Sequence, residues 1–349
     1  MKPVDNPPNP YESAHTQWLE PPPEARLTVY QEQARSALAE NDSPDLPFRW
    51  SCNPYRGCQH GCAYCYARTT HQYLGFGAGT DFDTRIVVKV NLPEALEKTL
   101  ARPSWRGEAI FFSGATDCYQ PLEASYHLTR RCLEVCLRHR NPVAVLTKSF
   151  LIARDVDLLA RLHRTAGLRV QVSIPLLDPT ACKALEPQAA TPARRFQAIR
   201  HLADAGVPVG VMIAPIVPGL SDREVPAILQ RAREAGASWA TCTALHLPGT
   251  VQQVFLARLR ADLPLKARRV EQRLHDIRGG NLGENRPGLR MKGQGPYWDS
   301  IMKLFELWRD RLGFEQRGDR DRLDRRPPGR GNPSRGQGVL ALKQLTLFE

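Results

Sequence analysis

Three cysteines in one short segment constrain this chain more than any other feature. The sequence RGCQHGCAYCYAR, residues 56–68, places Cys58, Cys62 and Cys65 at the spacing C-x₃-C-x₂-C. In a reducing compartment, thiols this close together are typical of a metal or redox centre rather than of disulfides. No fourth cysteine lies beside them. The sequence therefore raises the question of which centre three thiolates can hold.

Length and composition indicate the class of protein. The 349 residues, 42% of them hydrophobic, suit one large α/β domain with extensions or two smaller domains. No apolar run approaches the roughly 20 residues that cross a bilayer, and the N-terminal sequence lacks the hydrophobic stretch of a signal peptide. We therefore expect a cytoplasmic protein with no membrane contact, whose nine cysteines stay reduced.

The net charge of +12 is consistent with nucleic acid or another polyanion as a partner. The alternative is a basic protein whose charge serves solubility alone. Much of the arginine lies near the C-terminus, in a Gly/Pro-rich tail at 315–349 that we expect to be disordered or loosely docked.

Buried strand patterns alternate with amphipathic helical patterns through the middle of the chain. This alternation predicts βαβ units and a parallel sheet. With one strand just before the cysteines there are about six repeats, which favours a partial (β/α)₆ TIM-type barrel; a doubly wound open sheet is the alternative. Both folds place the active site beyond the carboxyl ends of the strands. The other strand candidates are 109–114, 142–148, 168–174, 207–216 and 238–247.

The pattern divides the chain into four parts. A Pro-rich N-terminal extension, 1–47, contains one short helical candidate at 23–40. The barrel with the cysteine segment covers 48–250, and a helical region at 251–314 is expected to cap one face of the barrel before the tail begins. The strand candidate 85–90 has no obvious place in this scheme.

Several centres compete for the three cysteines. A structural zinc site needs four ligands, and His60 or His71 would have to supply the fourth. A bacterial ferredoxin would need more cysteines at two-residue spacing. Flanking Gly57 and Gly61 disfavour three merely buried thiols. A cubane [4Fe–4S] cluster fits best, because three thiolates leave one of its irons open to a substrate or second cofactor.

The motif, with Tyr64 before its last cysteine and βα repeats after it, resembles the radical S-adenosylmethionine (SAM) superfamily. The resemblance implies that SAM chelates the open iron through its amino and carboxylate groups. An electron then cleaves SAM, and the resulting 5′-deoxyadenosyl radical takes a hydrogen atom from the substrate. It also implies a flavodoxin or ferredoxin as the electron donor.

The resemblance places SAM contacts at successive strand ends. In SGATDCYQPLE, Gly114, Thr116 and Asp117 match in kind the segment that binds the SAM amino group, although the usual Gly-Gly-Glu is absent. Asp117 has an alternative as a helix N-cap or turn residue. Lys148 suits the SAM carboxylate. Ser173 suits the ribose, or is a satisfied buried serine.

The remaining implied contacts come from later segments. Arg195 falls where relatives carry an arginine toward SAM, and its neighbour Arg194 is the alternative one residue away. Ile216 begins a turn, 216–219, whose backbone resembles the adenine side of the SAM site. Tyr64 would offer its backbone to the adenine edge.

Residues 48–250 are most similar to the spore photoproduct lyase-like group, through NPYRGCQHGCAYCYAR, TDCYQPLE, LTKSFLIARDVDLL and APIVPGLSD. Spore photoproduct lyase returns a hydrogen atom from a cysteine near the end of its second strand, a position that falls near Gly114 here. Cys118 is a candidate substitute, and Cys242 is another if it faces the barrel interior. Both have the alternative of small buried hydrophobes, the interpretation we favour for Cys132 and Cys136.

Three functions follow. The favoured one is a radical SAM enzyme that modifies an unknown substrate, because the donor cysteine is missing. A DNA-lesion lyase is the second, favoured by the charge. A zinc-stabilised nucleic-acid-binding module without catalysis is the third, and iron content against zinc content separates it from the other two.

Overall fold

The computed structural model describes residues 6–11 and 26–315. Apart from Glu315, the tail predicted at 315–349 lies outside the described residues, as does most of the first half of the N-terminal extension.

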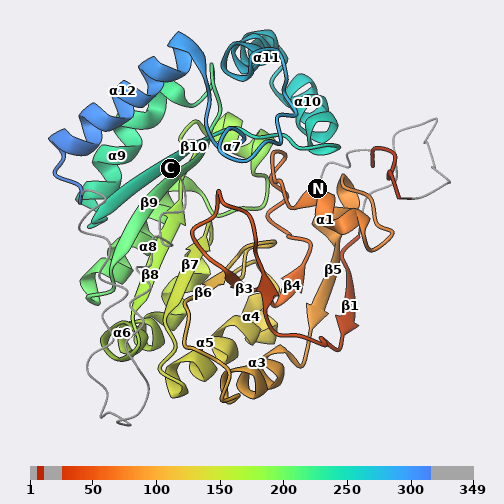
Figure 1. Cartoon of the computed structure of the whole chain (residues 1–349). Helices are drawn as coiled ribbons and strands as arrows, with labels where there is room; N and C mark the ends of the chain where they lie inside the picture. The colour runs from red at the N-terminus through yellow and green to blue at the C-terminus, as the bar shows by residue number, and fades with distance from the viewer. Residues whose placement is uncertain (1–5, 12–25, 316–349) are drawn as a thin grey trace.

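The described chain is built on one sheet whose parallel strands follow the order of the sequence (Figure 1). The short β2 joins the edge of β3 in antiparallel orientation. A doubly wound sheet reverses its strand order at a switch point, and this sheet has no reversal between β3 and β10. The prediction of a partial (β/α)₆ barrel is therefore confirmed. The strands are β2 (Ala39–Glu40), β3 (Trp50–Cys52), β6 (Ile110–Phe112), β7 (Val143–Thr147), β8 (Leu168–Ser173), β9 (Val209–Ile216) and β10 (Trp239–Ala244).

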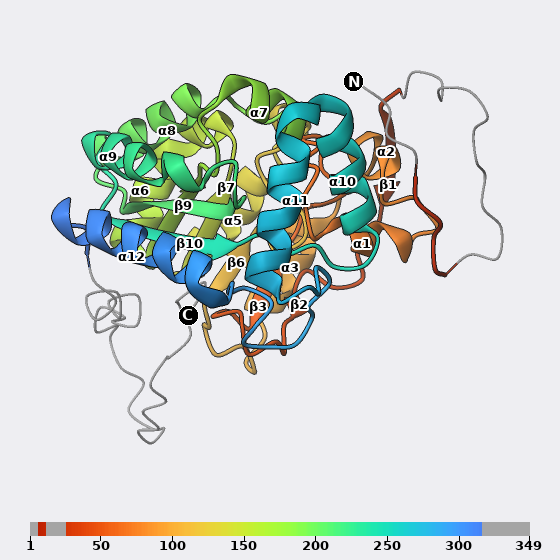
Figure 2. The same cartoon turned by 90° about the horizontal axis from the view of Figure 1, so that it is seen from above.

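Helices between the strands cover the outer face of this sheet (Figures 1 and 2). They are α3 (Leu92–Leu100), α5 (Leu128–Arg138), α6 (Val156–Thr165), α8 (Pro192–Asp204) and α9 (Val225–Glu234). The connections also contain the short helices α4 (Glu123–Tyr126) and α7 (Pro179–Leu185), which pack outside the main core, and 3₁₀ turns at η1 (Phe150–Asp155) and η2 (Asp222–Glu224).

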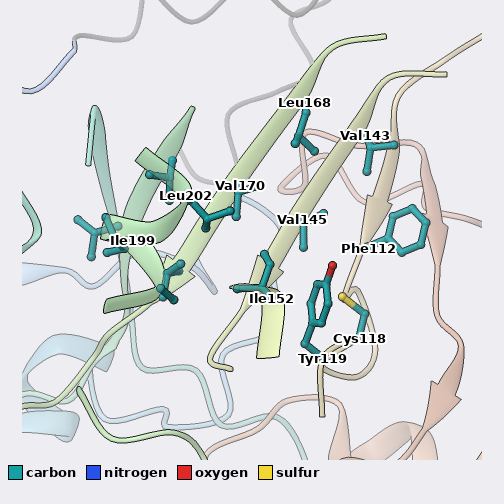
Figure 3. Close-up of a cluster of buried hydrophobic side chains, with 14 of the residues drawn as sticks. Phe112, Cys118, Tyr119, Val143, Val145, Ile152, Leu168, Val170, Ile199 and Leu202 are labelled. Atoms are coloured by element: carbon teal, nitrogen blue, oxygen red, sulfur yellow. The ribbon is translucent and has the colours of Figure 1, made fainter. Parts of the chain in front are cut away.

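The period of two along each strand separates the core from the barrel interior. Val170 and Val172 of β8 pack with Ile199 of α8 in the main hydrophobic cluster (Figure 3). The residues between and after them, Gln171 and Ser173, therefore face the interior. The polar groups described below lie on this inward face, at the carboxyl ends of the strands.

A second, three-stranded sheet stands beside the barrel, in the order β1 (Thr28–Glu32), β5 (Arg85–Lys89), β4 (Tyr55–Arg56). It places the strand candidate 85–90, which pairs with β1 in parallel and with β4 in antiparallel orientation. The helix predicted at 23–40 is wrong, because the Thr-Val-Tyr run of β1 has strand propensity and completes the ladder of β5. Short helices α1 (Arg68–Gln72) and α2 (Thr80–Thr84) follow the cysteine segment.

The C-terminal helices are α10 (Val251–Asp262), α11 (Pro264–Arg278) and α12 (Gly295–Arg311). Helices α10 and α11 share a hydrophobic cluster with Tyr64 of the cysteine segment and Leu185 of α7. Helix α12 instead lies along α9 (Figures 1 and 2). The helical region 251–314, predicted to form one cap, therefore packs in two places: α10 and α11 against the cysteine segment, and α12 against α9. In the described part of the chain, no helix has the length and apolar character of a membrane span.

Candidate functional site

The cysteine segment, residues 56–68, needs glycine at two turns. Gly57 has φ +77° and Gly61 has φ +64°, both in the left-handed region that L side chains rarely adopt. A Cβ on Gly57 would also lie 2.9 Å from the carbonyl oxygen of Phe82. Glycines before and after Cys58 therefore let the backbone wind tightly enough to bring the three cysteines into one loop.

Backbone hydrogen bonds hold this loop to distant parts of the chain. The N–H of Cys58 donates to the carbonyl of Phe82 at 3.0 Å, and the N–H of Ala63 donates to the carbonyl of Leu185 at 2.8 Å. The Thr116 hydroxyl, from the segment after β6, donates to the carbonyl of Gly57 at 2.7 Å. The loop is thereby fixed against α2, α7 and the end of β6.

Two buried arginines, neither of them predicted from the sequence, hold the same loop. Arg68 Nε donates to the carbonyl of Cys62 at 2.9 Å, and Arg258 Nη1 of α10 donates to the carbonyl of Gly61 at 2.6 Å. Both guanidinium groups pair with Asp83, at 2.8 and 2.6 Å. An arginine among the apolar residues of an amphipathic helix is the one sequence signal for Arg258.

The three thiols form a donor set that fits an iron–sulfur cluster. Cys58 and Cys62 are buried and Cys65 is partly buried. Burial raises the pKa of Cys65 to about 11 and raises the pKa of Cys62 well above its usual value. These two thiols are therefore protonated without a metal, and a bound cationic centre would displace their protons.

Within residues 6–11 and 26–315, no set of side chains is arranged to hold a zinc ion. His60 Nδ1 lies 3.3 Å from Asp117 Oδ2. Burial opposes the charged imidazole, but Asp117 and Cys58 outweigh it and raise the pKa of His60 to about 10. His71 packs between Phe76 and Phe82, and burial lowers its pKa to about 4. No three His, Cys, Asp or Glu side chains among the described residues are grouped around one ion. A cubane does not need that grouping, because each thiolate binds a different iron.

The segment after β6 lies against the cysteine loop, and the carboxylate of Asp117 is already hydrogen-bonded to protein groups. Its carboxylate accepts hydrogen bonds from the Thr147 hydroxyl and the Lys148 N–H, both at 2.7 Å, and from the Tyr119 N–H at 2.9 Å. Such bonds are expected if Asp117 is a turn residue, the alternative role that the sequence offered. The carbonyl of Gly114 accepts a 2.5 Å hydrogen bond from the Tyr66 hydroxyl of the loop.

Lys148 and Ser173 meet at the ends of β7 and β8. Lys148 Nζ lies 2.6 Å from Ser173 Oγ and 3.5 Å from the carbonyl of Ala214 in β9. The ammonium also lies 5.8 Å from the centre of the Tyr64 ring. Three neighbouring strand ends and the cysteine loop thus converge at one cation.

Arg195, not Arg194, points into this site. Arg195 is 1% exposed; its Nη1 donates to the carbonyl of Ser173 at 3.1 Å and its Nη2 donates to Glu186 Oε2 at 2.5 Å. Arg194 is exposed and lies over the ring of Phe150 at 3.6 Å. The sequence left these two neighbours open; Arg195 is the one that lies in the site, and its contact with SAM stays a prediction.

Glu186 is a residue of this site that was not predicted from the sequence. Its carboxylate accepts hydrogen bonds from Arg195 and from the Tyr64 hydroxyl, and it lies 3.7 Å from Lys148 Nζ. Burial opposes its ionisation, but Arg195 and Lys148 outweigh it and lower its pKa. Glu186 follows the last turn of α7, a position that no sequence pattern connects with β7 or β8.

Ile216 lies buried at the end of β9, where its carbonyl accepts a hydrogen bond from the Leu245 N–H at 3.2 Å. This bond joins the turn after β9 to the segment after β10. The predicted role of that turn toward adenine stays a prediction.

The two candidate hydrogen donors lie away from this convergence. Cys118 is fully buried with Phe112 and Tyr119 in the main core (Figure 3). Cys242 Sγ lies 3.7 Å from Met302 Sδ of α12, on the outer side of β10. The condition set for Cys242, that it face the barrel interior, is wrong, because Thr241 and not Cys242 contacts the inward-facing Gln171. Cys132 and Cys136 lie in the core, as predicted.

Comparison with known proteins adds independent observations. The family model described as "Radical SAM superfamily" matches residues 52–232. An uncharacterized protein of Mycobacterium tuberculosis (strain ATCC 25618 / H37Rv) is 37% identical over 255 residues, which is 71% of this chain and 74% of the relative. The radical SAM Nalpha-GlyT isomerase of Pseudomonas phage M6 is 28% identical over 169 residues, 48% of this chain and 33% of that protein.

Solved structures agree on the fold. A mutant of spore photoproduct lyase with bound AdoMet and dinucleoside spore photoproduct superposes with a TM-score of 0.56, over 81% of this chain and 78% of that chain at 19% identity. Because the identity is low, this likeness speaks for the fold alone. Taken with the family match over the cysteine loop and most of the barrel, it leads to one conclusion: this chain belongs to the radical SAM superfamily and has a spore photoproduct lyase-like fold.

Proposed function

We propose that this protein is a radical SAM enzyme that binds a [4Fe–4S] cluster through Cys58, Cys62 and Cys65 and binds SAM at the open iron. When bound, these groups supply reductive cleavage of SAM and a 5′-deoxyadenosyl radical that abstracts hydrogen from a substrate. A low-potential flavodoxin or ferredoxin is the proposed electron donor.

One observation carries the proposal. Side chains from separate segments, Tyr64, Lys148, Ser173 and Arg195, converge beside the cysteine loop around a single buried carboxylate, Glu186. Charged groups buried this deeply are expensive unless they are paired or used. Their position at the carboxyl ends of β7 and β8 is where a barrel of this type places its active site.

The chain's own groups have distinct tasks in this proposal. The three thiolates bind iron, while Arg68 and Arg258 fix the carbonyls between them. The Lys148 ammonium would bind the carboxylate of SAM, and the Ser173 hydroxyl would bind its ribose. The hydrophobic cluster of α7, α10 and α11 shields the Tyr64 side of the loop from water.

A nucleic-acid pyrimidine is the second candidate, as a substrate class within the same chemistry. The solved structure with a similar fold holds a dinucleoside spore photoproduct, the phage relative is named as a GlyT isomerase, and this chain carries a net charge of +12. The core position of Cys118 weighs against return of hydrogen by a cysteine after β6. We therefore favour a substrate other than a thymine dimer.

The test of the proposed function is anaerobic. The protein is reconstituted with iron and sulfide, reduced with dithionite and given SAM, and 5′-deoxyadenosine is measured by mass spectrometry. Product from the wild type and none from Cys62→Ala supports the proposal. Irradiated DNA is then tried first, because it tests the second candidate directly. Purified protein that holds zinc and no iron, and yields no product, would overturn it in favour of a zinc-stabilised binding module.

A further inference from the structure

We propose that Glu186 is a positioning residue that presents the Lys148 ammonium to the carboxylate end of SAM. The inference rests on the proposed function, because it concerns the same cofactor site. It assigns a role to a residue that neither the motif nor the strand ends predict.

The two cations around Glu186 are used differently. Arg195 is 1% exposed, and each of its three nitrogens has a protein acceptor: Ala190 O, Ser173 O and Glu186 Oε2. The Lys148 side chain is 15% exposed and its distance to Glu186 is 3.7 Å, longer than a hydrogen bond. Arg195 donates from every nitrogen to the protein and is almost wholly enclosed, whereas the Lys148 ammonium, which donates to Ser173 Oγ and approaches the carbonyl of Ala214, is the more exposed cation and the one that a ligand can reach.

The charges of the group leave a place for one anion. Lys148 and Arg195 carry two positive charges and Glu186 carries one negative charge, so these three side chains together retain one positive charge, apart from the charge of the cluster. They therefore attract a carboxylate rather than repel it. The carboxylate of SAM is such a partner, since one of its two oxygens would chelate the iron together with the amino group and the other would remain open to Lys148.

The direction of the Lys148 side chain depends on its partners. A lysine has a flexible four-carbon stem and keeps its orientation only where partners hold it. Glu186 attracts the ammonium from one side, while Ser173 Oγ at 2.6 Å accepts from it on another. Without the carboxylate, Arg195 would repel Lys148 and the ammonium would turn toward solvent.

Glu186→Gln is a decisive variant, because two simple ideas predict opposite results. If only net charge matters, removal of the negative charge strengthens the binding of an anionic group. If Glu186 positions Lys148, SAM binding weakens by about tenfold, the size of effect that 1.4 kcal/mol produces. The measurement is anaerobic titration calorimetry of SAM into protein with the oxidised cluster, in which SAM is bound but not cleaved.

A double-mutant cycle shows whether Glu186 acts through Lys148. We expect Lys148→Met to weaken SAM binding, and we expect Glu186→Gln to add less than about twofold in that background, because coupled residues are not additive. Methylthioadenosine, which lacks the amino acid part, should bind wild type and Glu186→Gln equally. The matched control is Glu224→Gln, whose carboxylate accepts from the backbone N–H groups of Leu177 and Asp178 and should leave SAM binding unchanged.

The outcomes separate this inference from the proposed function. Failure of the wild type to bind SAM overturns the proposed function. A wild type that binds SAM, with Glu186→Gln binding equally or more tightly, overturns the inference alone. If Glu186→Gln does not retain its cluster, Glu186→Asp keeps the charge but shortens the reach; SAM affinity equal to that of the wild type would contradict the positioning role.

Discussion

Two groups of cysteines in this molecule are buried to a similar degree yet have different surroundings. The motif thiols Cys58 and Cys62 are 6% and 7% exposed and lie in a loop held by buried arginines and backbone amides. The core thiols Cys52, Cys118, Cys132 and Cys136 are 0% exposed and pack among valine, leucine and phenylalanine side chains. Burial alone therefore does not distinguish a metal-binding cysteine from a small core residue. The polar groups around the thiol distinguish the two.

The largest effect is expected from substitution of a motif cysteine. Cys62→Ala removes one of three iron ligands, so we expect loss of the cluster and of all 5′-deoxyadenosine formation. Cys136→Ala is the matched core variant and should keep iron content and product. Iron, sulfide and product are measured on both proteins side by side. Retention of a full cluster by Cys62→Ala would show that the two groups do not differ as we describe.

The next effect concerns the polar surroundings of the loop. Arg258→Met leaves the Asp83 carboxylate with one cation instead of two and frees the carbonyl of Gly61. Asp83 stays paired with Arg68, so the loss is that of buried hydrogen bonds made by a charged group, and we expect the free energy of unfolding of the cluster-free protein to fall by about 1.5–3 kcal/mol. Denaturant unfolding measures it. Arg260→Met, which breaks an exposed pair with Glu271, is the control and should cost under about 1 kcal/mol.

A smaller effect is expected in the core. Cys118→Ala leaves a cavity of about one sulfur atom, and we expect a destabilisation of about 1 kcal/mol with unchanged 5′-deoxyadenosine yield. Thermal unfolding and product analysis check both parts. Loss of product with retained stability and cluster would reveal a role in the chemistry that the packing of Cys118 does not predict.

The smallest effect is expected at Cys242. Its sulfur contacts Met302 of α12 on the outer side of β10, so Cys242→Ala should change neither cluster content nor product by more than about twofold. The free energy of unfolding should fall by at most about 1 kcal/mol. A large drop in substrate turnover, once a substrate is known, would place this thiol in the reaction after all.

The sequence was sufficient for the barrel because its strands and helices carry their pattern locally. Candidates such as 168–174 and 207–216 correspond closely to β8 and β9. The strand β1 was missed because its residues also fit a short helix, and only the open edge of β5, more than fifty residues later, selects the strand.

The residues of the site likewise fall into those that the sequence marks locally and those that it does not. Cys58, Lys148 and Ser173 were predictable because a motif or a strand end marks them. Glu186 and Arg258 were not, because their partners lie in distant segments and a helical arginine or glutamate is usually a surface residue. Cys242 lies on the outer side of β10. The period of two predicts that it lies on the opposite face from Thr241, but the sequence does not indicate which of the two faces points inward.

The most direct test of the central claim is spectroscopic. We predict that anaerobically reconstituted protein holds about four irons and four sulfides per chain. We also predict that the electron paramagnetic resonance signal of the reduced cluster changes on addition of SAM, because SAM binds the open iron. One zinc and no iron per chain, or a cluster signal that SAM does not alter, would contradict the assignment of Cys58, Cys62 and Cys65 as a three-thiolate site with an open iron.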